Sequence, residues 1–493
     1  MGGVIARNPG AAAGRTYDVI VIGGGVYGIA VAHRATCLGL RALLLERDDF
    51  GGASSGNSLR ILHGGIRSLQ SLDLRCFRDM FVAQSWFLRH FPEHVAALEC
   101  LMPLYGRGLR RPLAFQAALR LDRLLRRLCA IGHRSSGLPA GKVLDVQETQ
   151  DRFSLVPSPG LQGGGVWYDV LMRHPQRVLI DWLRWACDGG ATALNRVAAQ
   201  QLLVKNGRVA GVVAHDGLTD RSLLFRASTV INCAGPWSEE LSRAFDRNAP
   251  ECFRPTLAFN LLLDRLPIAQ SAVAVETPSG SRRTYFIVPW GKHTMVGTYH
   301  GPEPVLPDQL GPSTEQIQQM LRELNAAVPT WNLRLDTVLR VYSGLLPGRF
   351  QGQEEELETR ATIHDHGRNG GPPGLFTVAG VKFTTAPVVA ARVLRAAGLR
   401  TRGPIAQVPR PPARPIPDLA SFRRTLATKP REAAEWLRTL VAEESVLSVK
   451  DLLHRRTDWS FDPSEEHELE RLIRPLMPPV GAAPESLSQA RAG

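Results

Sequence analysis

The sequence predicts an α/β fold, in which a parallel sheet binds a dinucleotide and an antiparallel sheet is inserted into the same domain. Three observations support this prediction. A glycine-rich strand–turn–helix lies near the N-terminus, a second strand–turn–helix lies around residue 380, and alternating strands lie between them. A charged helical segment follows a proline-rich stretch, which predicts a small helical domain at the C-terminus.

The first of these motifs occupies residues 17–46. Its apolar run at 19–22 is typical of a strand buried on both faces of a parallel sheet. Three glycines fill the spacing G-x-G-x-x-G, in which missing Cβ atoms permit a tight turn and close approach of a pyrophosphate: Gly23, Gly25 and Gly28. A helix over about 27–38 presents its positive N-terminal end to the phosphates. A second strand ends in Glu46, about 20 residues past the glycines, where an acid binds ribose hydroxyls.

The composition narrows the class of protein. The 493 residues are 44% hydrophobic, enough for two or three domains or for one large cofactor domain with an insertion. The chain has no apolar run as long as a bilayer span and its seven cysteines form no C-x-x-C pair, so we expect a cytoplasmic protein without a structural metal. The net charge of +13 suits an anionic cofactor, substrate or lipid, although an arginine-rich genome would produce it as well. Because no nucleic-acid-binding motif accompanies this charge, no nucleic acid partner is expected.

The loop at 48–69 is rich in glycine and serine, so its backbone can come close to a planar ligand. Ser54 and Ser55 can donate their hydroxyls to phosphate or ring oxygens. His63 and Arg67 flank a glycine pair, and in this setting a role of His63 in a site and a purely structural role are equally open.

Two helices are predicted next. The segment 72–91 has the spacing of an amphipathic helix whose aromatic stripe packs in the core. The segment 107–134 carries eight arginines against one acid, with leucines between them. Such a basic amphipathic helix suits peripheral contact with the inner face of a membrane. The alternative, which we favour, is a helix packed on its own protein with a solvated charged face.

The middle of the chain is predicted to add strands. The Asn206–Gly207 dipeptide between two apolar runs is a strong hairpin signal. A buried strand at 229–233 ends beside Gly235, which returns the chain to the nucleotide. Between 255 and 340 the strands alternate and a helical pattern covers them, as expected for an antiparallel sheet that faces the cofactor.

The second strand–turn–helix begins with an apolar strand at 375–379. The strand runs into Gly380, and Lys382 and Thr384 precede a helix that Pro387 can open. This turn places backbone N–H groups and a helix N-terminus beside an anion or a polarised ring. A flavin needs such a distant second contact, whereas a nicotinamide rarely does, so the turn favours a flavin.

The predicted organisation has six parts, and the helical domain is expected to be separate from the rest. The parts are a disordered lead-in (1–16), a cofactor domain in two pieces (17–254 and 341–400), a substrate-binding antiparallel sheet (255–340), a stiff proline-rich linker (401–417), a helical domain (418–477) and a disordered tail (478–493).

Seven stretches together resemble one family: DVIVIGGGVYG, SLRILHGGIRSL, VINCAGPW, FIVPWGKHTMVGT, YSGLLP, VAGVKFTT and VKDLLHRRT. They span residues 17–457 in the order of the FAD-dependent glycerol-3-phosphate dehydrogenases, which belong with D-amino-acid oxidase among flavoproteins of the glutathione-reductase type. The resemblance implies a glutathione-reductase-type, Rossmann-like FAD-binding domain. It also implies the residues that bind FAD: Gly23, Gly25, Gly28, Glu46, Ser54, Ser55, Gly235, Gly380, Lys382 and Thr384.

The same resemblance implies that Arg67 and Lys382 bind a phosphate above the flavin ring. Several other family residues are replaced in this chain. The replacements are Leu346 for an arginine, with Arg349 nearby as a substitute, Ser68 for a tyrosine, Asn260 for a histidine, and Tyr299 and His300 within a G-T-T-D motif. We therefore expect that cofactor binding is kept, whereas substrate recognition is changed.

The expected reaction is removal of a hydride from an anionic alcohol, such as glycerol 3-phosphate or a related phosphorylated polyol, to flavin N5. His63 or His300 would take the hydroxyl proton. Quinone, oxygen or a protein would then reoxidise the flavin. Two alternatives stay open. One is an amino-acid or 2-hydroxy-acid oxidoreductase in which Arg67 binds a carboxylate, and the other is an FAD-binding protein without turnover that serves as a membrane-surface or partner module.

Overall fold

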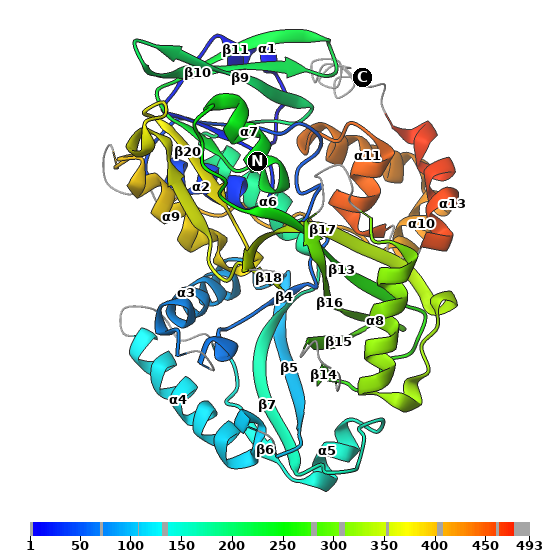
Figure 1. The fold of residues 1–493 in the computed structure, drawn as a ribbon. Helices are drawn as coiled ribbons and strands as arrows, with labels where there is room; N and C mark the ends of the chain where they lie inside the picture. The colour runs from blue at the N-terminus through cyan, green and yellow to red at the C-terminus, as the bar shows by residue number, and fades with distance from the viewer. Residues whose placement is uncertain are drawn as a thin grey trace.

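Three sheets and the helices around them make up the molecule (Figure 1). The computed structural model describes residues 3–69, 72–106, 108–130, 137–277, 283–304, 311–351, 354–401, 408–459 and 463–477. In Figure 1 a small sheet lies at one end of the molecule and the long strands β5 and β7 reach to the other end. The C-terminal helices, in orange and red, lie against the side.

The glycine motif belongs to a six-stranded sheet with the order β19-β20-β12-β2-β3-β8. Its strands pair in parallel, except that β19 runs antiparallel to β20. The strands are β2 (Val19–Ile22), β3 (Ala42–Leu45), β8 (Thr192–Leu194), β12 (Val230–Asn232), β19 (Thr362–Asp365) and β20 (Leu375–Ala379). One face is covered by α2 (Val26–Cys37), α6 (Pro175–Asp188) and α9 (Ala386–Ala396). Strands β2, β12 and β20 and helix α2 lie close to the ranges predicted from their hydrophobic patterns.

Strand β2 shows why the run at 19–22 is apolar throughout. Val19 and Val21 pack in the core beneath the three helices. Ile20 and Ile22 pack in a second core on the opposite face. Because successive side chains of a strand point to opposite faces, a strand between two cores needs an apolar residue at every position.

A four-stranded sheet, β1-β11-β10-β9, covers this opposite face. The elements are α1 (Pro9–Ala13), β1 (Thr16–Tyr17), β9 (Val197–Lys205), β10 (Arg208–Asp216), β11 (Arg221–Ala227) and α7 (Ser238–Phe245). The turn between β9 and β10 has φ of 53° at Asn206 and 73° at Gly207. A two-residue hairpin turn needs positive φ at both positions, so the predicted hairpin is confirmed.

The third sheet has ten strands in the order β18-β17-β13-β16-β15-β14-β5-β7-β4, with β6 paired to β7. The strands are β4 (Ile61–Leu62), β5 (Val95–Leu104), β6 (Lys142–Leu144), β7 (Gly163–Met172), β13 (Arg254–Leu263), β14 (Ala272–Glu276), β15 (Thr284–Trp290), β16 (His293–Pro304), β17 (Val338–Gln351) and β18 (Glu354–Leu357).

This sheet is wider than the range 255–340 that the sequence suggested for it, because it also takes in strands between residues 61 and 172. It includes β17 and β18 as well, which extend to residue 357 and were predicted to belong to the cofactor domain. The two parts join where β14 pairs in parallel with β5, with Ala272 opposite Cys100. Periodicity shows that a strand exists but not which distant strand it pairs with, so this junction could not be read from the sequence.

Four helices flank the ten-stranded sheet: α3 (Leu74–His90), α4 (Pro112–Ala130), α5 (Val146–Arg152) and α8 (Thr314–Ala327). Leu119 of α4 is buried, and Phe115 packs partly buried in the same cluster, so α4 packs on its own protein. The opposite side of α4 exposes leucines and arginines.

Short helical turns complete the chain: η1 (Ile66–Leu69), η2 (Gly108–Arg110), η3 (Gly235–Trp237), η4 (Pro329–Trp331), η5 (Leu335–Thr337), η6 (His366–Asn369), η7 (Phe383–Thr385) and η10 (Arg474–Leu476). Among the helices that the structure describes, none is long and apolar enough to cross a membrane.

Residues 3–16, expected to be a disordered lead-in, pack against the molecule instead. Ile5 is fully buried, and its backbone N–H donates to the carbonyl of Glu443 (2.8 Å). Arg7 forms an ion pair with Asp216. Apolar Ile5 and cationic Arg7 each find a partner that lies far along the chain, which a local reading of a Gly/Ala-rich segment cannot reveal.

The chain from 418 to 477, which we call the C-terminal unit, has a core of its own formed by Phe422, Leu437, Leu452 and Trp459 among others. Its helices are α10 (Leu419–Thr428), α11 (Pro430–Glu443), α12 (Val449–Asp451), the π-helix η8 (Leu452–Thr457) and α13 (Pro463–Ile473). The predicted linker contacts α6 at its residue 408, where Trp185 donates to the carbonyl of Val408 (2.8 Å). Residues 402–407 of the linker and the predicted tail 478–493 lie outside the described part of the chain.

Candidate active site

A cavity of about 1160 Å³ lies where the carboxyl ends of β2 and β3 face the ten-stranded sheet and the C-terminal unit. Its volume is slightly above the usual range for small-molecule sites, about 300–1,000 Å³. The carboxyl ends of parallel strands are where nucleotides bind in open α/β sheets. All three parts of the molecule contribute to its lining, which includes Gly25, Asn260 and Lys450.

The glycine motif forms a turn that tolerates no side chains at two positions. A Cβ on Gly28 would lie 1.8 Å from the Gly23 carbonyl oxygen, and one on Gly23 would lie 2.4 Å from that of Cys233. Helix α2 follows, and its N-cap, Gly25, offers no side chain to cap the helix. Gly25 and Val26 line the cavity at this N-terminus, where a pyrophosphate would be bound.

Glu46 is held at the end of β3 by two backbone donors. Gly24 N–H donates to its Oε2 (2.6 Å) and Asp48 N–H to its Oε1 (2.7 Å). Burial raises the pKa of Glu46, and these two bonds oppose the rise. Each carboxylate oxygen keeps a second lone pair, so both oxygens remain able to accept a ribose hydroxyl.

Ser54 and Ser55, in the loop after β3, line the cavity and are also hydrogen-bonded within the protein. Ser54 donates its hydroxyl to the carbonyl of Leu345 (2.9 Å). Ser55 Oγ accepts from the N–H of Val26 (3.0 Å), which leaves its own proton available for a phosphate oxygen. Of the two predicted phosphate donors, Ser55 is thus the one with a free hydroxyl proton.

The turn at residues 380–385 packs on Tyr27, a residue that the sequence analysis did not single out. The Tyr27 hydroxyl donates to the carbonyl of Lys382 (2.7 Å) and accepts from its N–H (3.1 Å). Burial raises the pKa of Tyr27 to about 12. A Cβ on Gly380 would lie 2.0 Å from the Tyr27 ring, so only glycine fits there. Gly235, Lys382 and Thr384 also line the cavity.

His63 reaches the cavity with one ring nitrogen fixed. Its Nδ1 lies 3.0 Å from Oδ2 of Asp169, and its side chain is 39% exposed. Asp169 is buried, which by itself raises its pKa, but the bonds from His63, from Gly64 N–H (2.6 Å) and from Trp167 Nε1 (3.2 Å) outweigh burial and hold the pKa below its usual range. An ionised Asp169 keeps the proton on Nδ1 of His63, which leaves Nε2 able to accept a proton.

The structure brings only one of the two candidate bases to the cavity. His300 lies on β16 opposite Ala258 and is not part of the described cavity lining, whereas His63 is. Leu346 and Asn260 line the cavity, and Ser68 does not. Asn260 is engaged by the protein, since it donates to the carbonyl of Asn57 (2.9 Å) and accepts from Thr298 (2.8 Å).

Among the predicted substrate cations, Lys382 lines the cavity, with its Nζ 3.8 Å from the sulfur of Met80. The backbones of Arg67 and Arg349 lie in η1 and β17. The side chains of these two arginines are outside the described part of the structure.

The C-terminal unit supplies cavity residues that the sequence analysis did not assign: Lys450, His454, Arg455 and Asp458. They belong to or directly follow the stretch VKDLLHRRT. The sequence analysis singled out this stretch but assigned no role to its residues. Asp169 was missed because it lies on a strand that is otherwise apolar, 106 positions from His63.

Comparison with known proteins agrees with this geometry. Residues 18–396 match the model of a family described as FAD dependent oxidoreductase. The glycerol-3-phosphate dehydrogenase of Synechocystis sp. is 28% identical over 75% of this chain and 68% of its own length. The alpha-glycerophosphate oxidase of Streptococcus pyogenes serotype M1 is 30% identical over 68% of this chain and 54% of its own length. The chain thus spans about half the length of this second relative.

Two solved structures share the fold. The glycerol-3-phosphate dehydrogenase of Bacillus halodurans, complexed with FAD, aligns with a TM-score of 0.71 at 21% identity and covers 95% of this chain and 91% of its own. The L-proline dehydrogenase of P. horikoshii aligns with a TM-score of 0.57 at 16% identity over 79% of this chain and 96% of its own. These similarities confirm the predicted fold class.

Proposed function

Because the chain belongs to the family of FAD dependent oxidoreductases, as predicted, we propose that it is a dehydrogenase acting on a small anionic alcohol, glycerol 3-phosphate or a related phosphorylated polyol. The relatives named for this substrate support the proposal. The observation that carries it is the cavity itself, which is lined by His63, held by Asp169, and by Lys382 of the turn that packs on Tyr27.

The residues of the cavity have separate roles in this proposal. FAD, when bound, would supply the acceptor for the hydride that leaves the alcohol carbon. The N-terminus of α2 would hold the pyrophosphate, and the Glu46 carboxylate would accept hydrogen bonds from the ribose hydroxyls. His63 accepts the hydroxyl proton at Nε2, and Asp169 holds the ring in the orientation that this requires. Lys382 binds the substrate anion, with Arg67 and Arg349 as further candidates.

An anaerobic titration tests the proposal. Purified FAD-loaded protein is mixed with glycerol 3-phosphate, and the visible flavin absorbance is followed. Bleaching with glycerol 3-phosphate, and none with glycerol at the same concentration, supports an anionic alcohol as substrate. A flavin that stays oxidised with a panel of phosphorylated polyols contradicts the proposal.

A second candidate function is favoured by Leu346. This apolar side chain lines the cavity where the family's arginine is expected, so it supplies no charge to bind a dianionic phosphate. An amino acid or a 2-hydroxy acid needs only one cation for its carboxylate. Adding both classes to the titration separates the two proposals. If none of the compounds bleaches the flavin, the third reading, an FAD protein without turnover, gains support.

The electron acceptor is open between quinone and oxygen. Among the relatives, one is named a dehydrogenase and the other an oxidase. Oxygen consumption by the reduced protein, compared with reduction of a soluble quinone, distinguishes the two acceptors.

We also propose that the protein is cytoplasmic and makes peripheral contact with the inner face of the membrane through α4. Three of its leucines are strongly exposed: Leu113 (80%), Leu124 (53%) and Leu128 (54%). Arg120, Arg123 and Arg127 are exposed on the same helix. Apolar side chains in the acyl boundary with arginines at lipid phosphates form a surface anchor. The test is flotation of the protein with anionic vesicles at low salt. Flotation of the unaltered protein that is lost when the three leucines are changed to serine supports the contact. If the unaltered protein does not float with the vesicles, the contact is contradicted.

A further inference from the structure

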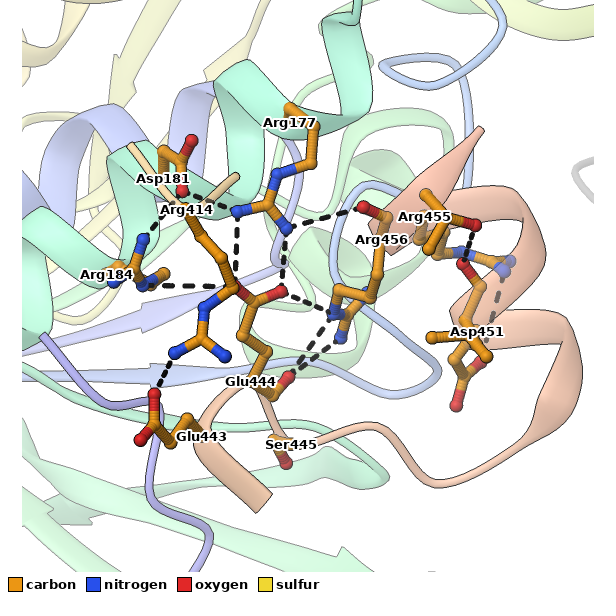
Figure 2. Close-up of polar contacts among 12 residues, drawn as sticks. Arg177, Asp181, Arg184, Arg414, Glu443, Glu444, Ser445, Asp451, Arg455 and Arg456 are labelled. Carbon is orange, nitrogen blue, oxygen red and sulfur yellow. Dashed lines mark hydrogen bonds and ion pairs between the residues drawn. The ribbon is translucent and has the colours of Figure 1, made fainter. Parts of the chain in front are cut away.

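A buried network of ion pairs joins the C-terminal unit to the body of the protein (Figure 2). Its central members carry opposite charges in equal number, and the side chain of each is at most 4% exposed: Arg177, Arg184, Arg456, Asp49, Asp181 and Glu444. Because a buried charge is costly unless it is paired and hydrogen-bonded, the network forms only when both sides of this interface are in place.

Glu444 is the point at which α6 binds the unit. Arg177 of α6 donates from its two terminal nitrogens to the Glu444 carboxylate, at 2.7 and 3.1 Å. The backbone carbonyl of Glu444 accepts from Arg456, at 3.1 Å from Nη2 and 3.3 Å from Nε. Figure 2 shows Arg456 beside Glu444, turned toward it from η8. These contacts with Glu444 orient the guanidinium of Arg456 from within the C-terminal unit.

Arg456 then reaches the loop that follows β3, residues 47–57, which we call the cofactor loop. Its two terminal nitrogens each donate to one oxygen of Asp49, both at 2.9 Å. Such a bidentate pair fixes direction as well as distance. Asn195 donates to the same carboxylate (3.0 Å) and to the carbonyl of Ser445 (2.9 Å), so a second bridge joins the loop to the unit.

The cofactor loop in turn holds the groups that surround the cofactor. The N–H of Asp48, next to Asp49, donates to Glu46. The N–H of Gly51 donates to the carbonyl of Gly24 (2.9 Å) within the glycine turn. At the far end of the loop, Ser55 accepts from the first residue of α2. An anchor at Asp49 therefore restrains both the carboxylate for the ribose and the turn for the pyrophosphate.

We infer that Arg456 is a positioning residue for FAD: through the Arg456–Asp49 pair the C-terminal unit orders the cofactor loop, and FAD binding and docking of the unit stabilise each other. The coupling must act in both directions, because linkage between two binding equilibria is reciprocal. The inference goes beyond the proposed function, since it concerns the retention of FAD and holds for any substrate.

The first test is a double variant of the full chain, Asp49→Asn with Arg456→Met. Changing both partners avoids leaving one buried charge without its counterion. The dissociation constant of FAD, measured by flavin fluorescence during titration of the apoprotein, is expected to rise by about 5- to 150-fold, the usual size of coupling between two sites. Arg456→Lys keeps the charge but loses the bidentate contact. Its dissociation constant for FAD is therefore expected to lie between that of the unaltered protein and that of the double variant.

A matched control is Asp79→Asn with Arg392→Met. Arg392 contacts both oxygens of Asp79 at 2.6 Å and joins α9 to α3, but neither residue lines the cavity. The dissociation constant of FAD is expected to be unchanged in this control. An unchanged constant in a folded Asp49→Asn/Arg456→Met protein would overturn the inference, and so would an equal rise in the control.

The second test uses the unaltered protein, so it can be carried out even if the double variant does not fold. Hydrogen exchange of the unaltered protein is compared with and without FAD, with attention to α11, none of whose described residues lines the cavity. FAD is expected to slow exchange in α11 as well as in the cofactor loop. Slower exchange in the loop alone overturns the inference, because docking of the unit would then be independent of FAD.

Discussion

At the scale of single residues, Asp169 determines which nitrogen of His63 can act. Replacing Asp169 by Asn is expected to lower kcat by about 10²- to 10⁴-fold, the size of a general-base contribution. The amide of Asn would donate to Nδ1 of His63 and move the ring proton to Nε2, which could then no longer accept a proton. Steady-state kinetics with the substrate that bleaches the flavin measure this effect, and the FAD content is expected to stay unchanged.

His300→Asn is the control for this assignment. His300 is outside the described cavity lining, so its replacement is expected to leave kcat unchanged, while His63→Asn lowers it as much as Asp169→Asn does. Loss of activity in His300→Asn with normal activity in His63→Asn would reverse the choice of base.

Leu346 gives a second prediction at this scale. In Leu346→Arg, the KM for glycerol 3-phosphate is expected to fall by about 10- to 100-fold, because a hydrogen bond to a charged group contributes about 1.5–3 kcal/mol. Initial rates at varied substrate concentration measure KM, and Leu346→Met serves as the control of similar size. An unchanged KM in Leu346→Arg would mean that the substrate anion binds elsewhere in the cavity.

The residues that the sequence placed well are those defined by local spacing. The glycines and Glu46 belong to one strand–turn–helix–strand unit, so their positions relative to one another follow from backbone geometry alone. Tyr27 lies within the same unit, yet its role depends on a turn 355 positions away. No local pattern reports such a contact.

At the scale of elements, α2 depends on the absence of a side chain at Gly28 in its first turn. Gly28→Ala is expected to produce protein without FAD and to lower the free energy of unfolding by about 1–3 kcal/mol or more, because the new Cβ would lie 1.8 Å from a backbone oxygen that cannot move away. The FAD absorbance of the purified protein and thermal unfolding measure these effects. Gly10→Ala in α1, where the nearest atom is 3.9 Å away, should change neither quantity.

Sequence patterns predicted elements with strong periodicity and missed how they pair. Helix α3 and strand β20 lie within a few residues of their predicted ranges, since each carries an apolar stripe or run between clear boundary residues. Pairing of β14 with β5 joins segments separated by about 170 residues of chain. Which strands pair depends on packing over the whole sheet. The hydrophobic periodicity of a single sequence does not contain this information.

At the scale of the whole molecule, buried histidines make the fold sensitive to mild acid. Burial lowers the pKa of His33 to about 3, and burial also lowers the pKa of His90, to about 4. His33 lies against Trp185, with ring centroids 4.1 Å apart. Both imidazoles are neutral in the folded protein near pH 5, whereas in the unfolded chain they bind protons below about pH 6.5.

Stability is therefore complete above about pH 6.5 and is lost as the pH falls toward the folded-state pKa values. For His33 the loss is expected to approach about 1.4 kcal/mol per pH unit. Denaturant unfolding at pH 7.5 and at pH 5 measures it. His33→Leu should weaken this pH dependence, and an identical dependence in that variant would contradict the assignment.

The order of strands in the six-stranded sheet has a consequence for synthesis of the protein. Strands β2 and β12 are neighbours, as are β12 and β20, yet β2 ends at residue 22 and β20 begins at residue 375. At a translation rate of about 5–20 residues per second, roughly 20–70 seconds separate the two strands. Before β20 is made, strand β12 lacks a neighbour on one edge, and Arg456 has not yet been made. A ribosome that stops before the C-terminal unit thus releases a chain with the complete glycine motif and an unanchored cofactor loop, which makes premature termination a route to aggregation rather than to a smaller flavoprotein.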